Sequence, residues 1–379
     1  MENFIAYNPV KLHFGRNVTN ELGNVAASYG KNILLVYGKG SVKKHGYYDL
    51  VVKQLKSVDC RIYEFSGIKP NPLVDDVDDA VKYAIDKSID AIVALGGGSV
   101  IDSAKIISVC IPGNHKGWDI MKRNVTPDKA IPVIAILTLA ATGTEMNSNA
   151  VLQNPATMEK IGYNNKHTFP AHSFLDPQFT YSVPPNQTAY GIVDLIAHAL
   201  EVFFGEGESS LSDRFIASII RDAMHYGPLL MKEPLNYDYR ANIMWDATCA
   251  LNGITSWGKA DGDWGVHAIG HQLSMLYDLP HGATLSIVYP AWLKLQHNRI
   301  PERIQTLGKL IFDTENAKET IENLTRFFSS LNSPVNLAEV QIGNDKKAEI
   351  IKLMNKNKVT GFCHKLSDND HVLLVNHMM

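Results

Sequence analysis

The sequence predicts an α/β domain with a Rossmann-like parallel sheet in residues 1–184, followed by an all-helical domain in residues 185–379. The chain of 379 residues is longer than one hydrophobic core usually accommodates, so two domains are expected. The first half alternates short apolar runs with amphipathic segments, whereas the second half contains long helical patterns. The Pro184–Pro185 pair marks the boundary, because a residue that precedes proline avoids the α region.

Strand and helix patterns alternate regularly in the first half. Short β-rich runs predict strands within residues 31–38, 60–68, 89–97 and 130–140, and amphipathic segments predict helices within 46–57, 74–88 and 100–111. Apolar strands that alternate with helices imply a parallel sheet covered on both faces. In the second half, the longest helical patterns span residues 188–204, 212–232 and 239–253.

Composition excludes several classes of protein. The net charge of −3 and the absence of a long basic run argue against a nucleic-acid partner. The longest apolar runs are too short and too rich in glycine to span a membrane, and the first residues lack the pattern of a secretory signal. The four scattered cysteines are typical of free thiols in a reducing compartment, so we expect a cytoplasmic protein: Cys60, Cys110, Cys249 and Cys363.

A glycine-rich segment, GGGSVID at 96–102, follows an apolar strand pattern and opens a helix pattern. Successive glycines let a backbone approach a phosphate closely, and a helix N-terminus offers free N–H donors. A tight strand-to-helix turn is the alternative interpretation. The segment does not match G-x-G-x-x-G, and the chain contains no GxxxxGK[ST], so neither an ordinary Rossmann dehydrogenase nor a P-loop enzyme is indicated.

Two segments of the second half each place a histidine four residues from another residue that can bind a metal. Asp194 and His198 are four residues apart and share one helix face, and His267 and His271 repeat this spacing on a second helix. His281 follows a Leu-Pro break, where a third helix is expected to begin. One carboxylate and two or three imidazoles could surround Zn²⁺ or Fe²⁺, which accept mixed nitrogen and oxygen ligands. The pattern alone does not decide between His267 and His271.

Four motifs together resemble the iron-containing (group III) alcohol dehydrogenase family: GGGSVID, LTLAATGTEMN at 137–147, DLIAHALE at 194–201, and VHAIGHQL…LPHG at 266–282. Details such as YGKGSVKKHG and GDWGVHAIGHQLS are similar to the bacterial branch of NADPH-dependent aldehyde reductases and butanol dehydrogenases. The resemblance implies a dehydroquinate synthase-like two-domain fold. It also implies the metal ligands, which are Asp194, His198, His267 and His281.

The resemblance implies a mechanism as well. The metal would act as a Lewis acid on the oxygen of a small aldehyde, and NADPH would supply the hydride. His271 would lie beside the substrate as the catalytic proton donor or relay, or would only tune a neighbouring residue. Asn147, Trp257 and Trp264 are expected to shape a pocket for uncharged small aldehydes or primary alcohols.

The cofactor contacts are also carried over from the family. Gly97, Gly98 and Ser99 would hold the pyrophosphate, and Asp102 would contact the carboxamide side of the nicotinamide. The segment 37–41 would meet the adenine ribose, and the adenosine side would be lined by Thr138, Thr142 and Lys160. Plain strand and turn chemistry is the alternative role for the two threonines.

The segment Tyr37-Gly38-Lys39-Gly40-Ser41 contains no Asp or Glu. A carboxylate on the adenine ribose is the usual barrier to NADP, because it repels the 2′-phosphate. Gly38 makes room, and Lys39 and Ser41 can bond to a phosphate. We therefore expect NADP(H) as the cofactor.

Two other functions compete with this interpretation. Glycerol dehydrogenases and dehydroquinate synthase share the two-domain plan, but an acidic phosphorylated substrate needs Lys or Arg beside the metal, and residues 262–274 contain none. A non-catalytic metal- or nucleotide-binding protein is the second alternative. The β-rich start at 4–15 would be an unprotected edge strand on its own. The family resemblance implies that this strand pairs across a two-fold axis, so we expect a homodimer.

Overall fold

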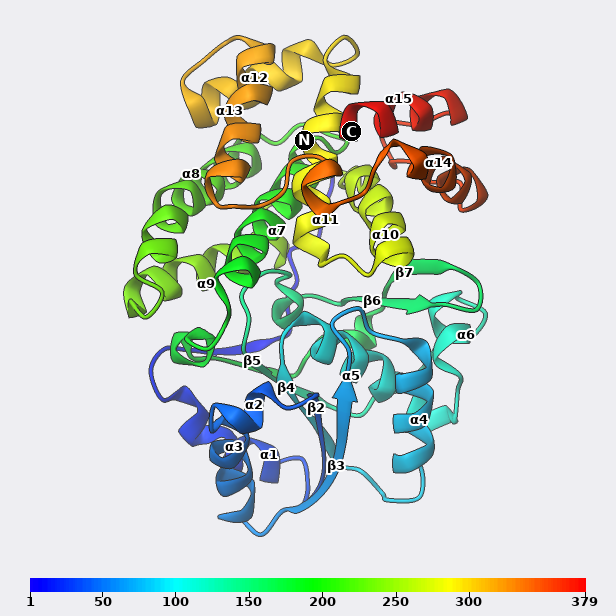
Figure 1. Ribbon diagram of the computed structural model, residues 1–379. Helices are drawn as coiled ribbons and strands as arrows, with labels where there is room; N and C mark the ends of the chain where they lie inside the picture. Colours follow the sequence, from blue (N-terminus) through cyan, green and yellow to red (C-terminus); the bar gives the residue numbers. More distant parts are fainter. The chain divides into compact units, whose positions relative to one another are not determined.

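The computed structural model describes all 379 residues, which form two compact units (Figure 1). One unit is Asn8–Val183, and the other combines Met1–Tyr7 with Pro184–Met379. The predicted α/β domain includes the first seven residues, whereas the structure groups them with the helical unit. The reason is local: the Glu2 backbone N–H donates to the Gly258 carbonyl at 2.9 Å, and Phe4 stacks on Trp257 at 6.5 Å.

A six-stranded sheet in the order β1-β8-β5-β4-β2-β3 forms the centre of the α/β unit. Every neighbouring pair is parallel, so the carboxyl ends of all strands lie along one edge. In sheet order the strands are Lys11–Phe14, His172–Leu175, Val133–Leu137, Ala91–Gly96, Asn32–Gly38 and Arg61–Ile68. This architecture confirms the predicted parallel α/β fold.

Both faces of this sheet are covered. On β2, Ile33 and Leu35 belong to one core cluster with Leu22 of α1 and Leu55 of α3, while the alternating residue Leu34 is equally buried on the opposite face. Side chains alternate between the faces of a strand, so burial of consecutive residues requires helices on both sides. The helices of this unit are α1 (Leu22–Ala27), α2 (Ser41–Lys44), α3 (Tyr47–Lys56), α4 (Val74–Ala84), α5 (Gly98–Cys110) and α6 (Gly117–Met121).

An antiparallel hairpin, β6 (Asn149–Asn154) with β7 (Glu159–Asn164), is separate from the main sheet. No strand pattern in the sequence predicts this hairpin. Its strands carry many polar residues, and β6 packs against α5 instead of extending the parallel sheet.

The second unit contains only helices as regular secondary structure, as predicted for the residues after Pro184. They are α7 (Pro185–Phe203), α8 (Ser210–Lys232), α9 (Tyr237–Leu251), α10 (Gly265–Tyr277), α11 (His281–Gln296), α12 (Pro301–Phe312), α13 (Ala317–Ser330), α14 (Lys347–Lys356) and α15 (Asp368–Met378). The α11 helix packs against both α7 and α10 (Figure 1). None of the helices combines the length and the apolar character that crossing a membrane would require.

Candidate metal centre and cofactor loops

Three helices of the second unit bring one carboxylate and three imidazoles together. Asp194 and His198 lie one turn apart on α7, His267 lies in the first turn of α10, and His281 is the first residue of α11. The Asp194 Oδ1 atom lies 3.8 Å from the Nε2 atoms of His198, His267 and His281 alike. The structure therefore brings one nitrogen of each of the three predicted histidine ligands to the same distance from one oxygen of Asp194.

The chemistry of this cluster fits a divalent cation. Asp194 Oδ1 and His267 Nε2 are buried and make no hydrogen bond, and 3.8 Å between them is too long for one. Two ligands bound at about 2.1 Å to one ion can lie up to roughly 4.2 Å apart, so the spacing suits atoms that share an ion. The donor atoms of Asp194, His267 and His281 all lie within 4.8 Å of one another. Mixed nitrogen and oxygen donors suit Fe²⁺ or Zn²⁺.

Local sequence explains how His281 reaches the cluster. Asp278 ends α10 in the left-handed conformation, with φ of 51°, and the Leu279–Pro280 step starts α11 at His281. The next residue, Gly282, packs directly against the backbone of α7: a Cβ at Gly282 would lie 2.1 Å from the Tyr190 carbonyl oxygen. Only glycine permits this approach, which places His281 beside the helix that carries Asp194.

A buried carboxylate that is not among the predicted site residues holds His267. Glu201, on α7, is 1% exposed, and its Oε1 atom lies 2.8 Å from His267 Nδ1 and accepts the His267 backbone N–H at 2.9 Å. Burial lowers the pKa of His267, but Asp194 and Glu201 outweigh this effect and raise the pKa to about 9. The available signal was the spacing in DLIAHALE, which puts Glu201 one turn after His198.

Other predicted residues surround this centre. The His271 ring lies one turn after His267, with its centroid 5.3 Å from that of His281, and it is buried. Trp264 lies edge-on to His267 at 5.5 Å and adopts the left-handed conformation, with φ of 60°. Such a conformation is uncommon for a bulky residue and is found at functional sites. Trp257, in contrast, stacks on Phe4.

In the α/β unit, the glycine loop connects β4 to α5 as predicted. Gly97 caps α5, whose first residue is Gly98. A Cβ at Gly98 would lie 2.9 Å from Thr142 Oγ1, so the loop and the segment that follows β5 are tightly packed. The Ser99 hydroxyl donates to the Pro70 carbonyl. The helix N-terminus leaves backbone N–H groups that can receive an anion.

Asp102 is buried and has partners within its own unit. Its Oδ1 accepts the Thr144 hydroxyl at 2.6 Å, and its Oδ2 accepts the Val151 N–H at 2.9 Å. Lys105 Nζ donates to Thr144 Oγ1 at 2.6 Å and to the Asn149 carbonyl at 2.7 Å. Burial raises the pKa of Asp102 and lowers that of Lys105 to about 8. This network fixes the segment after β5, and the predicted carboxamide contact of Asp102 stays a prediction.

Lys160 and Thr138, both predicted cofactor contacts, lie on different elements. Thr138 directly follows β5, and Lys160 lies on β7, where its Nζ donates to Asn71 Oδ1 at 2.9 Å in a buried position. The structure thus gives Lys160 a partner in the segment between β3 and α4.

The predicted ribose segment lies at the carboxyl end of β2. Gly38 is the last residue of the strand, Lys39 is exposed, and the exposed Ser41 begins the short helix α2. Nearby, Lys43 Nζ lies 3.8 Å from Glu64 Oε2, and the Tyr37 hydroxyl donates to the same atom at 2.8 Å. Glu64 lies on β3, so the absence of acids from 37–41 does not make the surroundings free of acidic side chains.

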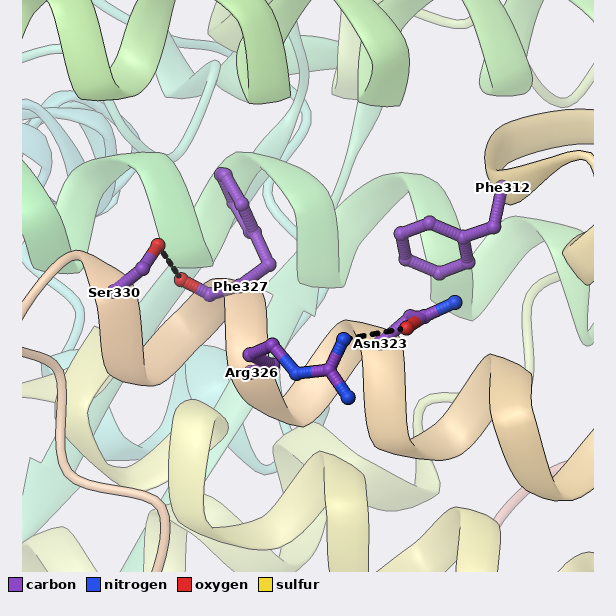
Figure 2. Close-up of a pocket in the computed structure, with 5 residues that line it drawn as sticks. All are labelled: Phe312, Asn323, Arg326, Phe327 and Ser330. Carbon is purple, nitrogen blue, oxygen red and sulfur yellow. Dashed lines mark hydrogen bonds between the residues drawn. The ribbon is translucent and has the colours of Figure 1, made fainter.

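A surface hollow of about 380 Å³ lies beside α12 and α13 (Figure 2). Phe312, Asn323, Arg326, Phe327 and Ser330 line it, and none of them is a predicted site residue. Figure 2 shows the Arg326 guanidinium directed to Asn323 Oδ1, to which it donates at 3.2 Å. This hollow is shallow and offers no cluster of ligands.

Comparison with known proteins agrees with the geometry. Two family models match in succession: iron-containing alcohol dehydrogenase over residues 9–177, and the C-terminal domain of the Fe-containing alcohol dehydrogenase family over 188–375. The chain is 38% identical to a probable NADH-dependent butanol dehydrogenase of Bacillus subtilis, covering 98% of both chains. It is 34% identical to the NADPH-dependent aldehyde reductase YqhD of Escherichia coli, covering 99% of this chain and 97% of that one.

A solved structure shows the same fold. The crystal structure of NADH-dependent butanol dehydrogenase A from Thermotoga maritima matches with a TM-score of 0.96 and 36% identity, covering 100% of this chain and 99% of that one. The two family models together span almost the whole sequence, and their order follows the two units of the structure. The chain belongs to the iron-containing alcohol dehydrogenase family.

Proposed function

We propose that this protein is a metal-dependent oxidoreductase that transfers hydride between NADPH and small aldehydes or primary alcohols, as an aldehyde reductase or butanol dehydrogenase. The observation that carries the proposal is the convergence of the Asp194 carboxylate with three imidazole nitrogens, each 3.8 Å away. The names of the relatives from Bacillus subtilis and Escherichia coli support the substrate class.

The residues have distinct roles in this proposal. Asp194, His198, His267 and His281 would hold Fe²⁺ or Zn²⁺, which supplies Lewis-acid chemistry toward the aldehyde oxygen when bound. The buried His271 ring, 5.3 Å from that of His281, is proposed to deliver a proton to the alkoxide oxygen or remove one from the alcohol. Trp264, edge-on to His267, would wall the substrate side and exclude water.

The proposed substrate is small and uncharged. The segment 262–274, which supplies His267 and His271, carries no Lys or Arg that could pair with a phosphate or carboxylate. This feature favours butanal-like aldehydes over the acidic phosphorylated substrate of a dehydroquinate synthase-like enzyme. A glycerol dehydrogenase-like activity is separated from the proposal by comparing turnover of butanal with oxidation of glycerol.

The metal assignment is tested with His281→Ala. The variant should lose both bound metal and turnover of butanal, because it removes one of four ligands while leaving α11 in place. His225→Ala is the matched control, since His225 is an exposed histidine on α8 of the same unit. Metal content is measured after purification without air or chelator. Full metal content in His281→Ala would contradict the assignment.

The preference for NADPH is a separate part of the proposal. It rests on the acid-free segment at 37–41 and on the charge of Lys39 and Lys43 nearby. The relatives differ in this respect: the Bacillus subtilis relative is named a probable NADH-dependent enzyme and the Escherichia coli relative an NADPH-dependent enzyme. A charge-assisted bond to the 2′-phosphate contributes roughly 1.5–3 kcal/mol, or about tenfold or more in preference.

Steady-state kinetics with both cofactors test this preference. An equal or higher kcat/KM for NADH refutes it. Gly38→Asp should shift the preference toward NADH, and the substitution is sterically feasible because a Cβ at Gly38 meets only the Ile68 carbonyl oxygen, at 3.5 Å. Gly40→Ala is the control, because a Cβ there meets nothing within 4 Å and adds no charge.

We also propose that the protein is a cytoplasmic homodimer. Phe4, Ile5 and Tyr7 are exposed, and β1 is an edge strand that pairs only with β8. A second copy could cover these apolar residues and the free edge. Light scattering at micromolar concentration checks the assembly, and a monomeric mass counts against it. The four cysteines, all free, agree with a reducing compartment.

A further inference from the structure

Glu201 is a buried acid, and one of its carboxylate oxygens contacts both the ring and the backbone of His267. The Oε1 atom lies 2.8 Å from the ring Nδ1 of His267 and 2.9 Å from the backbone nitrogen of the same residue. The side chain is 1% exposed, so it is shielded from water at both contacts. A carboxylate in such a place is costly unless polar groups satisfy it, and the two His267 groups do so.

We propose that Glu201 is a positioning residue of the metal centre, which sets both the tautomer and the ring orientation of His267. An imidazole nitrogen binds a metal through its lone pair, so the neutral ring must carry its proton on the other nitrogen. When Nδ1–H donates to Glu201, the lone pair is left on Nε2, the atom that lies 3.8 Å from Asp194 Oδ1. This inference rests on the proposed metal site.

The backbone contact adds a second constraint. His267 is the third residue of α10, and the first N–H groups of a helix have no partner within that helix. Glu201 satisfies one of these donors and places negative charge at the positive end of α10. One atom of α7 therefore fixes both the first turn of α10 and the ring that this turn carries. The same helix α7 supplies Asp194 and His198, so Glu201 ties the third ligand to the first two.

The neighbouring acid Asp263 contacts the start of α10, where its Oδ2 accepts the Gly265 backbone N–H at 3.3 Å, but it makes no ion pair with the His267 ring. It accepts the backbone N–H groups of Cys363 at 2.9 Å and His364 at 2.6 Å, and so fixes the segment before α15. The His267 ring has its carboxylate contacts to Glu201 and Asp194 alone. The tautomer of His267 is therefore set by one residue outside the proposed ligands.

Zinc affinity and imidazole NMR test the proposal on intact purified protein. Zn²⁺ affinity of the metal-free enzyme is measured by chelator competition for the wild type, Glu201→Gln and Glu201→Leu. Loss of the acceptor in Glu201→Leu should weaken Zn²⁺ binding by about 10–100-fold. Glu201→Gln retains an acceptor oxygen, so its loss of Zn²⁺ affinity should be clearly smaller than that of Glu201→Leu. Asp246→Asn, which changes another buried acid of the same unit without a contact to His267, is the control and should match the wild type.

The NMR arm needs no variant. In the Zn²⁺-loaded wild type with ¹⁵N-labelled histidine, His267 should carry its proton on Nδ1 and bind zinc through Nε2. A His267 ring protonated on Nε2, or Zn²⁺ affinity unchanged in a folded Glu201→Leu, overturns the role of Glu201. If the wild type itself binds no Zn²⁺, the proposed metal centre is refuted. If the wild type binds Zn²⁺ and the Glu201 variants bind it equally well, only the role of Glu201 is refuted.

Discussion

The contact between Gly282 and Tyr190 gives the sharpest test of how the fold positions the proposed metal ligands. Gly282 follows His281 in the first turn of α11, and a Cβ at this position would lie 2.1 Å from the Tyr190 carbonyl oxygen and 2.7 Å from its carbon. Both obstacles are backbone atoms of α7, so no side-chain rotation can relieve the clash. Gly282→Ala must therefore push the start of α11 away from α7.

The size of this displacement follows from the distances. An ordinary Cβ contact begins near 3.4 Å, so the separation from the Tyr190 oxygen must grow by about 1.3 Å. His281 adjoins the displaced residue, whereas Asp194 stays on α7 one turn after Tyr190. Metal–ligand distances tolerate only about 0.2 Å. We expect a loss of roughly 100-fold in kcat/KM, as for other misplacements of about 1 Å, and a fall of about 1–3 kcal/mol in the free energy of unfolding.

Gly227→Ala is the matched control for this substitution. Gly227 lies within α8 of the same unit, and a Cβ there meets Ile192 side-chain atoms at 3.4 Å, which is ordinary contact. Both substitutions replace a glycine within a helix by alanine, so the chemical change is the same. Zinc content after dialysis, kcat/KM with butanal and NADPH, and urea unfolding are compared for the two. If Gly282→Ala keeps its metal and turnover as well as Gly227→Ala does, the close approach of α11 to α7 does not position His281.

Two further predictions concern stability. Burial and the nearby Asp222 raise the pKa of Asp246 to about 8, so the folded chain holds this proton more tightly than the unfolded chain. The free energy of unfolding of the wild type should therefore fall relative to that of Asp246→Asn as the pH rises from 4 to 8, by up to about 1.4 kcal/mol per pH unit. Urea unfolding measures this difference, and a difference that does not change with pH would refute the prediction. Lys105→Met removes the cation from the network around Thr144 and should lower the free energy of unfolding by about 3–5 kcal/mol. Lys82→Met, at an exposed position, is the control and should change it little. A decrease below about 1 kcal/mol in Lys105→Met would contradict a stabilising role of the buried network.

Local periodicity in the sequence was enough to predict the parallel sheet and the helical second half. Strands such as β2 and β4 are continuous apolar runs, and that pattern arises because both faces of a parallel sheet are covered. The hairpin β6–β7 lacks such a run, since its strands mix polar and apolar residues and pack on α5 instead of within the sheet. Its residues therefore showed no pattern that distinguishes a strand from a loop.

The cluster of proposed metal ligands was predictable only in part for a similar reason. Spacing on one helix is visible in sequence, so the Asp194–His198 pair stood out. The choice between His267 and His271 depends on the direction of α10 relative to α7, which the structure supplies: His267 groups with Asp194 and His281, and Glu201 lies on its other ring nitrogen. The approach of Gly282 to Tyr190 likewise joins residues far apart in the chain and leaves no local pattern.

The charge around the ribose segment 37–41 could not be predicted from local sequence either, because an acid from another strand approaches this segment. Glu64 on β3 accepts the hydroxyl of Tyr37 at 2.8 Å and that of Tyr48 at 2.7 Å, and its carboxylate lies 3.8 Å from Lys43 Nζ. Lys43 also lies over the Tyr48 ring, 4.4 Å from its centroid. Glu64 thus holds the Lys43 ammonium group beside the segment that we propose for the 2′-phosphate. Its carboxylate also offsets part of the positive charge of Lys43.

Glu64→Gln should therefore increase the preference for NADPH. If the 2′-phosphate binds about 7 Å from the Glu64 carboxylate, Coulomb's law in a water-like dielectric gives a repulsion of about 0.6 kcal/mol, which is roughly threefold in relative affinity. Glutamine keeps an oxygen that can accept a hydrogen bond from a tyrosine hydroxyl, so the segment 37–41 should retain its shape. We expect the ratio of kcat/KM for NADPH to that for NADH to rise about threefold in Glu64→Gln and to fall in Lys43→Met, with the rise reduced at high salt. An unchanged or lower ratio in Glu64→Gln would show that the 2′-phosphate is bound away from this carboxylate, or that Glu64 acts mainly by holding Lys43 in place.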